Sequence, residues 1–198
     1  LGTLLAAVAD ALLDGARGNS GAIMAQFFQG MSDSAGELSR FTPYTLAKAV
    51  SMGSDYAHDA MSKPREGTIL TVIAVFATSI ANDATHNADG GFAALVGKAL
   101  EKSRQALAET QEQLDVLRKA GVVDAGAKGF VDLVDGMAEY LHTGNSVDKP
   151  DLSLLSIETP LVTAGSSLES GYRFCTECIV TGVDIDRRKL REALSSLG

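Results

Sequence analysis

The chain has 198 residues, of which 45% are hydrophobic and 21% charged, and its formal net charge is −8. An acidic chain without a basic stripe is not expected to bind nucleic acid, and no apolar run reaches the roughly 18 residues that a membrane span needs. Two cysteines give no disulfide framework, and the first residues lack the basic start of a signal peptide, so we expect a cytoplasmic protein. The start at Leu1 rather than Met, and the end directly after a helical pattern, indicate a piece of a longer protein.

Apolar residues at helical spacing dominate the first part of the chain and predict an all-α fold, an antiparallel bundle or barrel of amphipathic helices. Residues 69–82 are apolar on nearly all sides and are expected to form the central helix. A polar connection is expected at 32–39 and a loop at 82–91. The predicted helices cover residues 4–13, 23–31, 44–61, 69–82, 92–113, 116–120 and 130–141.

The composition changes at Asn145, after which two prolines and several Ser and Thr residues break the helical period. We therefore expect a helical domain over 1–144 and a linker over 145–170. Residues 171–198 are expected to begin an α/β domain, with a strand over 173–183 and a helix over 186–197.

Three glycine-rich segments, 15–21, 64–68 and 123–129, each precede an apolar helical pattern. Each offers a side chain that can cap a helix, namely Ser20, Thr68 and Asp124. An open helix N-terminus attracts anions, above all phosphate, because its backbone N–H groups and its dipole point at the ligand. One long helix lies between each pair of segments, so antiparallel packing would bring all three starts to the same end of the bundle.

This spacing predicts one composite site for a phosphate-bearing ligand. The first segment is not a Walker loop, because no Gly-Lys-Ser/Thr follows it. The simpler alternative is that the three segments are ordinary turns with a capping residue. Asp124 is either a plain cap or a partner for a nucleotide hydroxyl, and Lys128 either offsets phosphate charge or is solvated. The predicted binding residues are Gly18, Asn19, Ser20, Gly21, Gly67, Thr68, Asp124 and Gly126.

Neither the histidines nor the cysteines are expected to form a metal site within this chain. His58, His86 and His142 lie far apart in the sequence. Cys175 and Cys178 have CxxC spacing, but on a strand their side chains would point to opposite faces. We expect them to be buried structural cysteines.

Four motifs, in order and spacing, resemble the bacterial fatty acid kinase family. They are Gly15–Gly21 (GARGNSG), Lys63–Val72 (KPREGTILTV), Gly121–Gly126 (GVVDAG) and Tyr172–Glu177 (YRFCTE). The first three resemble its kinase domain, which is similar to the nucleotide-binding L domain of dihydroxyacetone kinases. The fourth resembles the start of the middle domain of the fatty acid kinases.

The resemblance implies a helical barrel that holds ATP at one end and transfers a phosphoryl group to a fatty acid carboxylate. It also implies a separate lipid-binding partner protein that presents the acid. In the family, two Mg²⁺ ions are held by an Asp-Gly-Asp-x-Gly-x-Asn segment that this chain lacks. Residues 1–198 alone are therefore expected to be inactive, and no catalytic residue is assigned. The resemblance also implies a metal at Cys175, completed by histidines beyond Gly198.

Two other functions stay open at this point. One is a dihydroxyacetone-type kinase subunit that acts on a small hydroxyketone, and the other is a non-catalytic nucleotide or lipid sensor on the same scaffold. The strand and helix expected after the linker favour the fatty acid kinase. The lack of the aspartate segment keeps the sensor open. The sequence does not give the acyl chain preference, the identity of the partner or the oligomeric state, and a homodimer is one of the arrangements left open.

Overall fold

The computed structural model describes residues 1–16, 18–86, 91–145, 180, 182 and 185–195, and all regular structure among these residues is helical. The chain divides into two compact units, Leu1–Ser146 and Val147–Gly198. The helices are α1 (Gly2–Gly15), α2 (Gly18–Ala35), α3 (Pro43–Asp59), α4 (Ile69–His86), α5 (Gly91–Gln113), α6 (Asp115–Ala120), α7 (Ala125–Thr143) and α8 (Arg187–Ser195).

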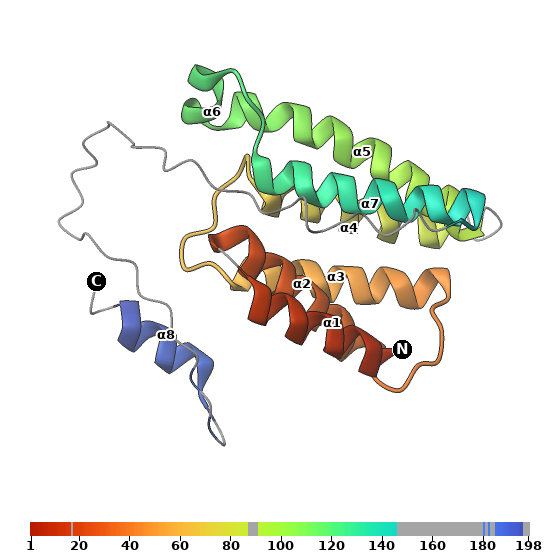
Figure 1. Ribbon diagram of the computed structural model, residues 1–198, viewed down its shortest axis with the longest axis horizontal. Coiled ribbons are helices and arrows are strands. Elements are labelled where there is room, and N and C mark those ends of the chain that lie inside the picture. The colour runs from red at the N-terminus through yellow and green to blue at the C-terminus, as the bar shows by residue number, and fades with distance from the viewer. Residues whose placement is uncertain (17, 87–90, 146–179, 181, 183–184, 196–198) are drawn as a thin grey trace, which may run out of the picture. The chain divides into compact units, whose positions relative to one another are not determined.

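The first unit is a bundle in which helices that follow one another in the chain run antiparallel and pack side by side (Figure 1). Helix α2 packs between α1 and α3, and α4 packs against α3, α5 and α7. In Figure 1 the helices α2, α4 and α7 begin at the same end of the bundle, whereas α1, α3 and α5 finish there. The all-helical, antiparallel fold class expected from the sequence is therefore confirmed.

Three phenylalanine rings in the core join α2, α4 and α7. The rings of Phe27 and Phe130 lie 5.7 Å apart and those of Phe76 and Phe130 lie 5.5 Å apart, both edge to face. All three side chains are buried. Edge-to-face pairs of this kind contribute about 0.5–1.5 kcal/mol beyond the area they bury. The three helices that begin at the same end of the bundle are thus held together in its interior.

Helices α2 and α3 approach each other through two glycines. A Cβ atom on Gly30 would lie 2.6 Å from the Met52 carbonyl oxygen, and one on Gly53 would lie 2.7 Å from the Phe27 carbonyl oxygen. Neither position has space for a larger residue, because the nearest atom in each case is a backbone carbonyl oxygen of the other helix.

The predicted starts of two connections are wrong, because the helix before each connection continues into it. The connection expected at 32–39 begins inside α2, which runs to Ala35. Ser32 is buried there and satisfies its hydroxyl by donating to the Gly2 carbonyl oxygen at 3.0 Å, so a polar residue sits inside the bundle. The loop expected at 82–91 also begins too early, since α4 runs to His86.

The second unit contributes α8, which agrees with the helix expected over 186–197. Its start is fixed by Asp186, whose carboxylate accepts from the Lys189 N–H at 3.0 Å. The expected linker, nearly all of the expected strand over 173–183, and Cys175 and Cys178 lie outside the described residues. The proposed domain bounds therefore stay predictions. Across the described part of the chain, no helix combines the length and apolar character that crossing a membrane requires.

Candidate functional site

The start of α4 is fixed by two threonine hydroxyls. Thr68 caps the helix, since its Oγ1 accepts from the Leu70 N–H at 3.3 Å and donates to the Arg65 carbonyl oxygen at 2.8 Å. Thr71 Oγ1 accepts from the Gly67 N–H at 2.9 Å and donates to the Glu66 carboxylate at 2.6 Å. The predicted cap at Thr68 is confirmed, and the loop before it is closed by its own hydrogen bonds.

Gly67 is needed in this loop for two reasons. Its φ of 78° lies in the left-handed region that side chains other than glycine rarely adopt. A Cβ atom at this position would also lie 2.8 Å from Gln113 Cβ and 3.0 Å from Leu114 Cγ, at the end of α5. The loop before α4 therefore lies directly against the C-terminal end of α5.

The start of α7 is capped by Asp124, as the sequence predicted. Its carboxylate accepts from the Ala127 N–H at 2.8 Å. The Asp124 N–H in turn donates to Thr110 Oγ1 on α5 at 3.1 Å. The carboxylate and the backbone of Asp124 are thus held by two different helices.

The predicted cap at Ser20 is wrong, because α2 begins two residues earlier, at Gly18. A φ of 65° at Gly18 lets the chain turn into the helix before Ser20 is reached. Ser20 instead lies against the start of α7, where a Cβ atom on Gly126 would be 2.4 Å from Ser20 Oγ. The small size of Gly126 thus lets the first turns of α2 and α7 touch.

The three helix starts meet at one pocket of about 480 Å³. Four of the predicted binding residues line it, and they come from the starts of α2, α4 and α7. The lining residues are Asn19, Ser20, Ile23, Met61, Ser62, Lys63, Pro64, Arg65, Thr68, Ile69, Leu70 and Asp124. Helix starts that open onto one pocket present backbone N–H groups and the positive ends of helix dipoles to the same ligand.

The four predicted glycines do not line this pocket. Gly126 and Gly67 pack behind it, against Ser20 and against the end of α5. Glycine is also required at position 21 for packing, because a Cβ atom there would lie 2.9 Å from Ala16 Cα in the turn between α1 and α2. Gly18 provides the turn into α2.

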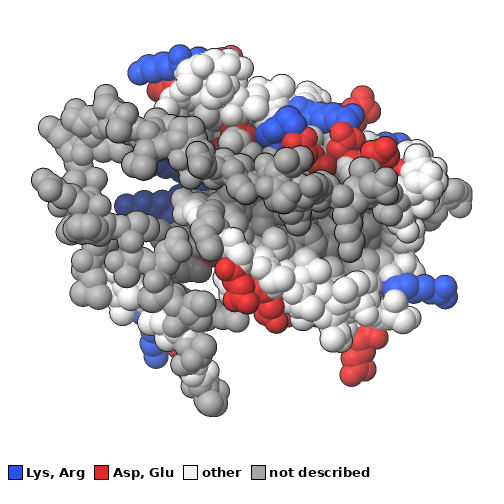
Figure 2. Space-filling view, viewed as in Figure 1, with Lys and Arg blue, Asp and Glu red and all other residues white. Residues whose placement is uncertain are grey.

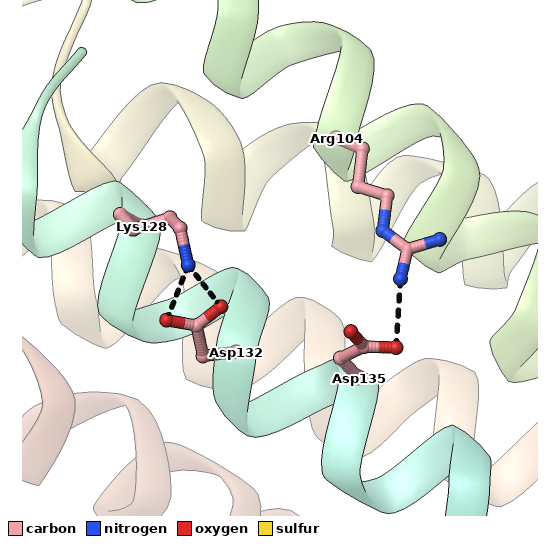
Figure 3. A network of polar contacts seen from close by, with 4 residues as sticks. All are labelled: Arg104, Lys128, Asp132 and Asp135. Carbon is pink, nitrogen blue, oxygen red and sulfur yellow. Dashed lines mark hydrogen bonds and ion pairs between the residues drawn. The ribbon is translucent and has the colours of Figure 1, made fainter. Parts of the chain in front are cut away.

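Lys128 is also outside the pocket. Its ammonium group pairs with the Asp132 carboxylate, at 2.6 Å from Oδ2, on the exposed side of α7 (Figure 3). Beside it, Arg104 of α5 pairs with Asp135 of α7 at 2.8 Å. Figure 2 shows acidic and basic side chains gathered over α5 and α7 on this face. The Lys128–Asp132 pair lies within α7 and the Arg104–Asp135 pair joins α5 to α7, so neither cation lines the pocket.

Two cations of the pocket, Lys63 and Arg65, were missed from the sequence. Both are exposed, and neither side chain forms an ion pair with a described residue. The sequence does contain a feature that could have identified them: they flank Pro64, directly before the Glu66-Gly67-Thr68 loop. An arginine and a lysine at a helix-start pocket are the side chains expected to bind phosphate oxygens.

The pocket fits an anion better than a metal ion. Asp124 is the one carboxylate among its lining residues, and the described residues contain no group of three or more His, Cys, Asp or Glu side chains able to hold a metal. Mg²⁺ in proteins is held by one or two carboxylates together with phosphate oxygens of the substrate. The described lining residues therefore suit the phosphates of a nucleotide, and the carboxylate that they offer to Mg²⁺ is that of Asp124, which also caps α7.

Comparison with known proteins identifies the family of this chain. Residues 1–139 match the family model Dak2, described as the DAK2 domain. Protein YloV of Bacillus subtilis (strain 168) is 33% identical over all of this chain, which spans 37% of that relative. The uncharacterized proteins SSP1546 of Staphylococcus saprophyticus and SAUSA300_1119 of Staphylococcus aureus (strain USA300) are 33% and 35% identical over 94% of this chain. The chain spans about a third of the length of these relatives, 35–37%. It belongs to the DAK2 domain family, a family of dihydroxyacetone-kinase-like domains.

Proposed function

We propose that this chain is the nucleotide-binding part of an ATP-dependent kinase that phosphorylates a fatty acid carboxylate presented by a lipid-binding partner protein. ATP and Mg²⁺ are the proposed cofactors, and Asn19, Ser20, Thr68 and Asp124 are the proposed nucleotide-binding residues. Gly18, Gly21, Gly67 and Gly126 contribute to the proposed site by shaping the turns and contacts behind it.

The observation that carries the proposal is the pocket at which three helix starts meet two cations, Lys63 and Arg65, that form no ion pair with a described residue. Phosphoryl transfer depends on positioning and on stabilisation of charge far more than on covalent chemistry by the protein. The helix starts supply the positioning. Each helix dipole contributes the equivalent of only about half a unit charge, so Lys63 and Arg65 supply the larger part of the positive charge among the described residues.

The choice of acceptor rests on the motifs that resemble fatty acid kinases. A protein that receives its acid from a partner needs an exposed docking surface that is partly apolar. Two exposed valines lie next to the end of α5: Val116 within α6 and Val122 just after α6. They support docking beside the loop of Gly67, which packs against the same end of α5.

The test of the nucleotide site is calorimetric titration of Mg-ATP into the full-length wild-type protein and into its double variant Lys63→Ala/Arg65→Ala. A hydrogen bond to a charged group contributes about 1.5–3 kcal/mol, so loss of both cations should weaken binding by about tenfold or more. Both side chains are exposed, so the unfolding temperature should not change.

The matched control is Lys48→Ala/Lys102→Ala, which removes the same charge from residues that do not line the pocket. Its affinity should stay within about twofold of the wild type, because charges far from the ligand are screened. If both double variants lost the same Mg-ATP affinity, Lys63 and Arg65 would act only through the overall charge of the protein and not through direct contact with the ligand. Absence of Mg-ATP binding by the wild type would contradict the proposed function itself.

A dihydroxyacetone-type kinase is the second candidate, and the family match favours it. The acceptors distinguish the two. Phosphate transfer from ATP should be measured with a fatty acid on its lipid-binding protein and with dihydroxyacetone, using the full-length protein. Transfer to the small hydroxyketone alone would select the second candidate. ATP binding without transfer to either acceptor would indicate a sensor.

A further inference from the structure

One buried hydroxyl group lies between the end of α5 and the loop that leads into α7. Thr110 is fully buried. Its Oγ1 donates to the Leu107 carbonyl oxygen at 2.7 Å within α5 and accepts from the Asp124 N–H at 3.1 Å. Asp124 is 14 residues away in the chain, so this hydrogen bond fixes the loop against a different helix.

The hydrogen bond acts on a residue that lines the pocket. Asp124 uses its carboxylate to cap α7, and its backbone carbonyl accepts from the Lys128 N–H at 3.0 Å. The Thr110 hydroxyl holds the remaining backbone group, the Asp124 N–H. Removal of this acceptor leaves a half-buried N–H group that must move toward water to be satisfied.

The same end of α5 also supports the loop that leads into α4. Gln113 and Leu114 lie against Gly67, where a Cβ atom would be 2.8 Å and 3.0 Å away from their side chains. The Leu114 N–H donates to the Thr110 carbonyl oxygen at 3.3 Å. The last turn of α5 therefore contacts both loops, although Thr110 itself does not line the pocket.

We propose that Thr110 is a positioning residue of the nucleotide pocket, which holds Asp124 and the start of α7 at the place where a phosphate-bearing nucleotide binds. This inference rests on the proposed nucleotide-binding function. The Thr110 hydroxyl thus contributes to nucleotide affinity, in addition to any contribution that the side chain makes to core packing.

A second buried hydroxyl on the same helix provides the matched control. Ser103 is fully buried two turns before Thr110, and its Oγ donates to the Ala99 carbonyl oxygen at 2.8 Å. Its hydrogen bond stays within α5 and reaches no loop. Ser103→Ala thus removes a buried hydroxyl from α5 without releasing the pocket.

The variants are Thr110→Val, which keeps the shape and removes the acceptor, Thr110→Ser, which keeps the hydroxyl, and Ser103→Ala. Mg-ATP affinity is measured by calorimetry on the full-length protein, and hydrogen exchange of the Asp124 amide is measured without ligand. We expect Thr110→Val to bind Mg-ATP about tenfold more weakly, which corresponds to about 1.4 kcal/mol. Its Asp124 amide should exchange at least about tenfold faster, while Thr110→Ser and Ser103→Ala should stay within about twofold of the wild type in both measurements.

Wild-type affinity in Thr110→Val, or equal weakening in Ser103→Ala, would overturn the positioning role while leaving the nucleotide site intact. Failure of Thr110→Ser to restore affinity would also overturn it, because the hydroxyl would then not be the group that matters. If the wild type itself does not bind Mg-ATP, the proposed function fails and the inference fails with it, whatever the exchange of Asp124 shows. If Thr110→Val does not fold, Thr110→Ser with wild-type affinity and wild-type exchange supports the proposal, and a weaker affinity in that variant contradicts it.

Discussion

The α2–α3 crossing and the contact between α2 and α7 behind the pocket both contain glycines with no room for a side chain, but the neighbours that fill the space differ. At the crossing, Cβ atoms on Gly30 and Gly53 would meet carbonyl oxygens of the opposite helix. Behind the pocket, a Cβ atom on Gly126 would meet Ser20 Oγ at 2.4 Å. A hydroxyl can rotate to another rotamer, whereas a helix backbone can only shift as a whole. A short distance therefore predicts a loss of stability at the crossing and a loss of function at the pocket.

The largest effect is expected for Gly30→Ala at the crossing. The new methyl group would force α2 and α3 apart, which should lower the free energy of unfolding by about 3 kcal/mol, at the upper end of the usual cost of overpacking. The measurement is urea unfolding followed by far-ultraviolet circular dichroism.

Gly97→Ala in α5 is the control for this variant, since a Cβ atom there would have no neighbour within 4 Å. It should stabilise the protein by about 0.5–1 kcal/mol, because alanine favours the helix more than glycine does. Equal stability of the two variants would show that α2 and α3 do not approach closely in solution.

An intermediate effect, on binding rather than on stability, is expected for Gly126→Ala. The methyl group displaces the Ser20 hydroxyl from its place at the pocket, so Mg-ATP affinity should fall by about fivefold, which corresponds to loss of one hydrogen bond of about 1 kcal/mol. The free energy of unfolding should change by less than about 1 kcal/mol, because the better helix propensity of alanine offsets the movement of Ser20.

Gly129→Ala, one turn further along α7, provides the comparison for Gly126→Ala. A Cβ atom at position 129 would have no neighbour within 4 Å. Calorimetry should give this variant the affinity of the wild type. Were it to lose as much affinity as Gly126→Ala, the effect would come from the helix as a whole and not from Ser20.

The smallest effect is expected at the surface ion pair between Arg104 and Asp135, which joins α5 to α7. The two side chains are 55% and 50% exposed, so the pair should contribute no more than about 0.5–1 kcal/mol to the free energy of unfolding. A double-mutant cycle with Arg104→Met and Asp135→Asn, measured at low and at high salt, gives the coupling energy. A coupling well above this range that persists at high salt would indicate a buried and structurally essential pair.

The sequence predicts those parts of the site that depend on local hydrogen bonds. Thr68 and Asp124 could be recognised as caps because a cap binds N–H groups two or three residues away. Ser20 was misassigned because the tight turn after α1, which Gly18 makes, decides where α2 begins. The contact of Ser20 with Gly126 depends on packing between distant segments, which no local pattern encodes.

Longer-range features could not be predicted for the same reason. The Thr110 hydrogen bond to Asp124 spans 14 residues and depends on how the chain turns around α6. Ser32 was assigned to a polar connection because the residues that follow it are mostly polar, as in a loop. In the structure its hydroxyl donates to the Gly2 carbonyl oxygen inside the bundle. Lys63 and Arg65 belong to one of the motifs but were not predicted to bind the ligand. The sequence does not show which basic side chains of a loop line a pocket.

The ring of Phe130, packed between Phe27 and Phe76, has a consequence for how this pocket can diverge. The rings belong to α2, α4 and α7, the helices whose starts line the pocket. A substitution that moves these helix starts therefore also disturbs folding. Lys63 and Arg65 are exposed residues of the pocket and do not belong to that core. Residues 63 and 65 can therefore be exchanged at little cost in stability, and relatives that keep the three core rings are free to acquire different ligand preferences there.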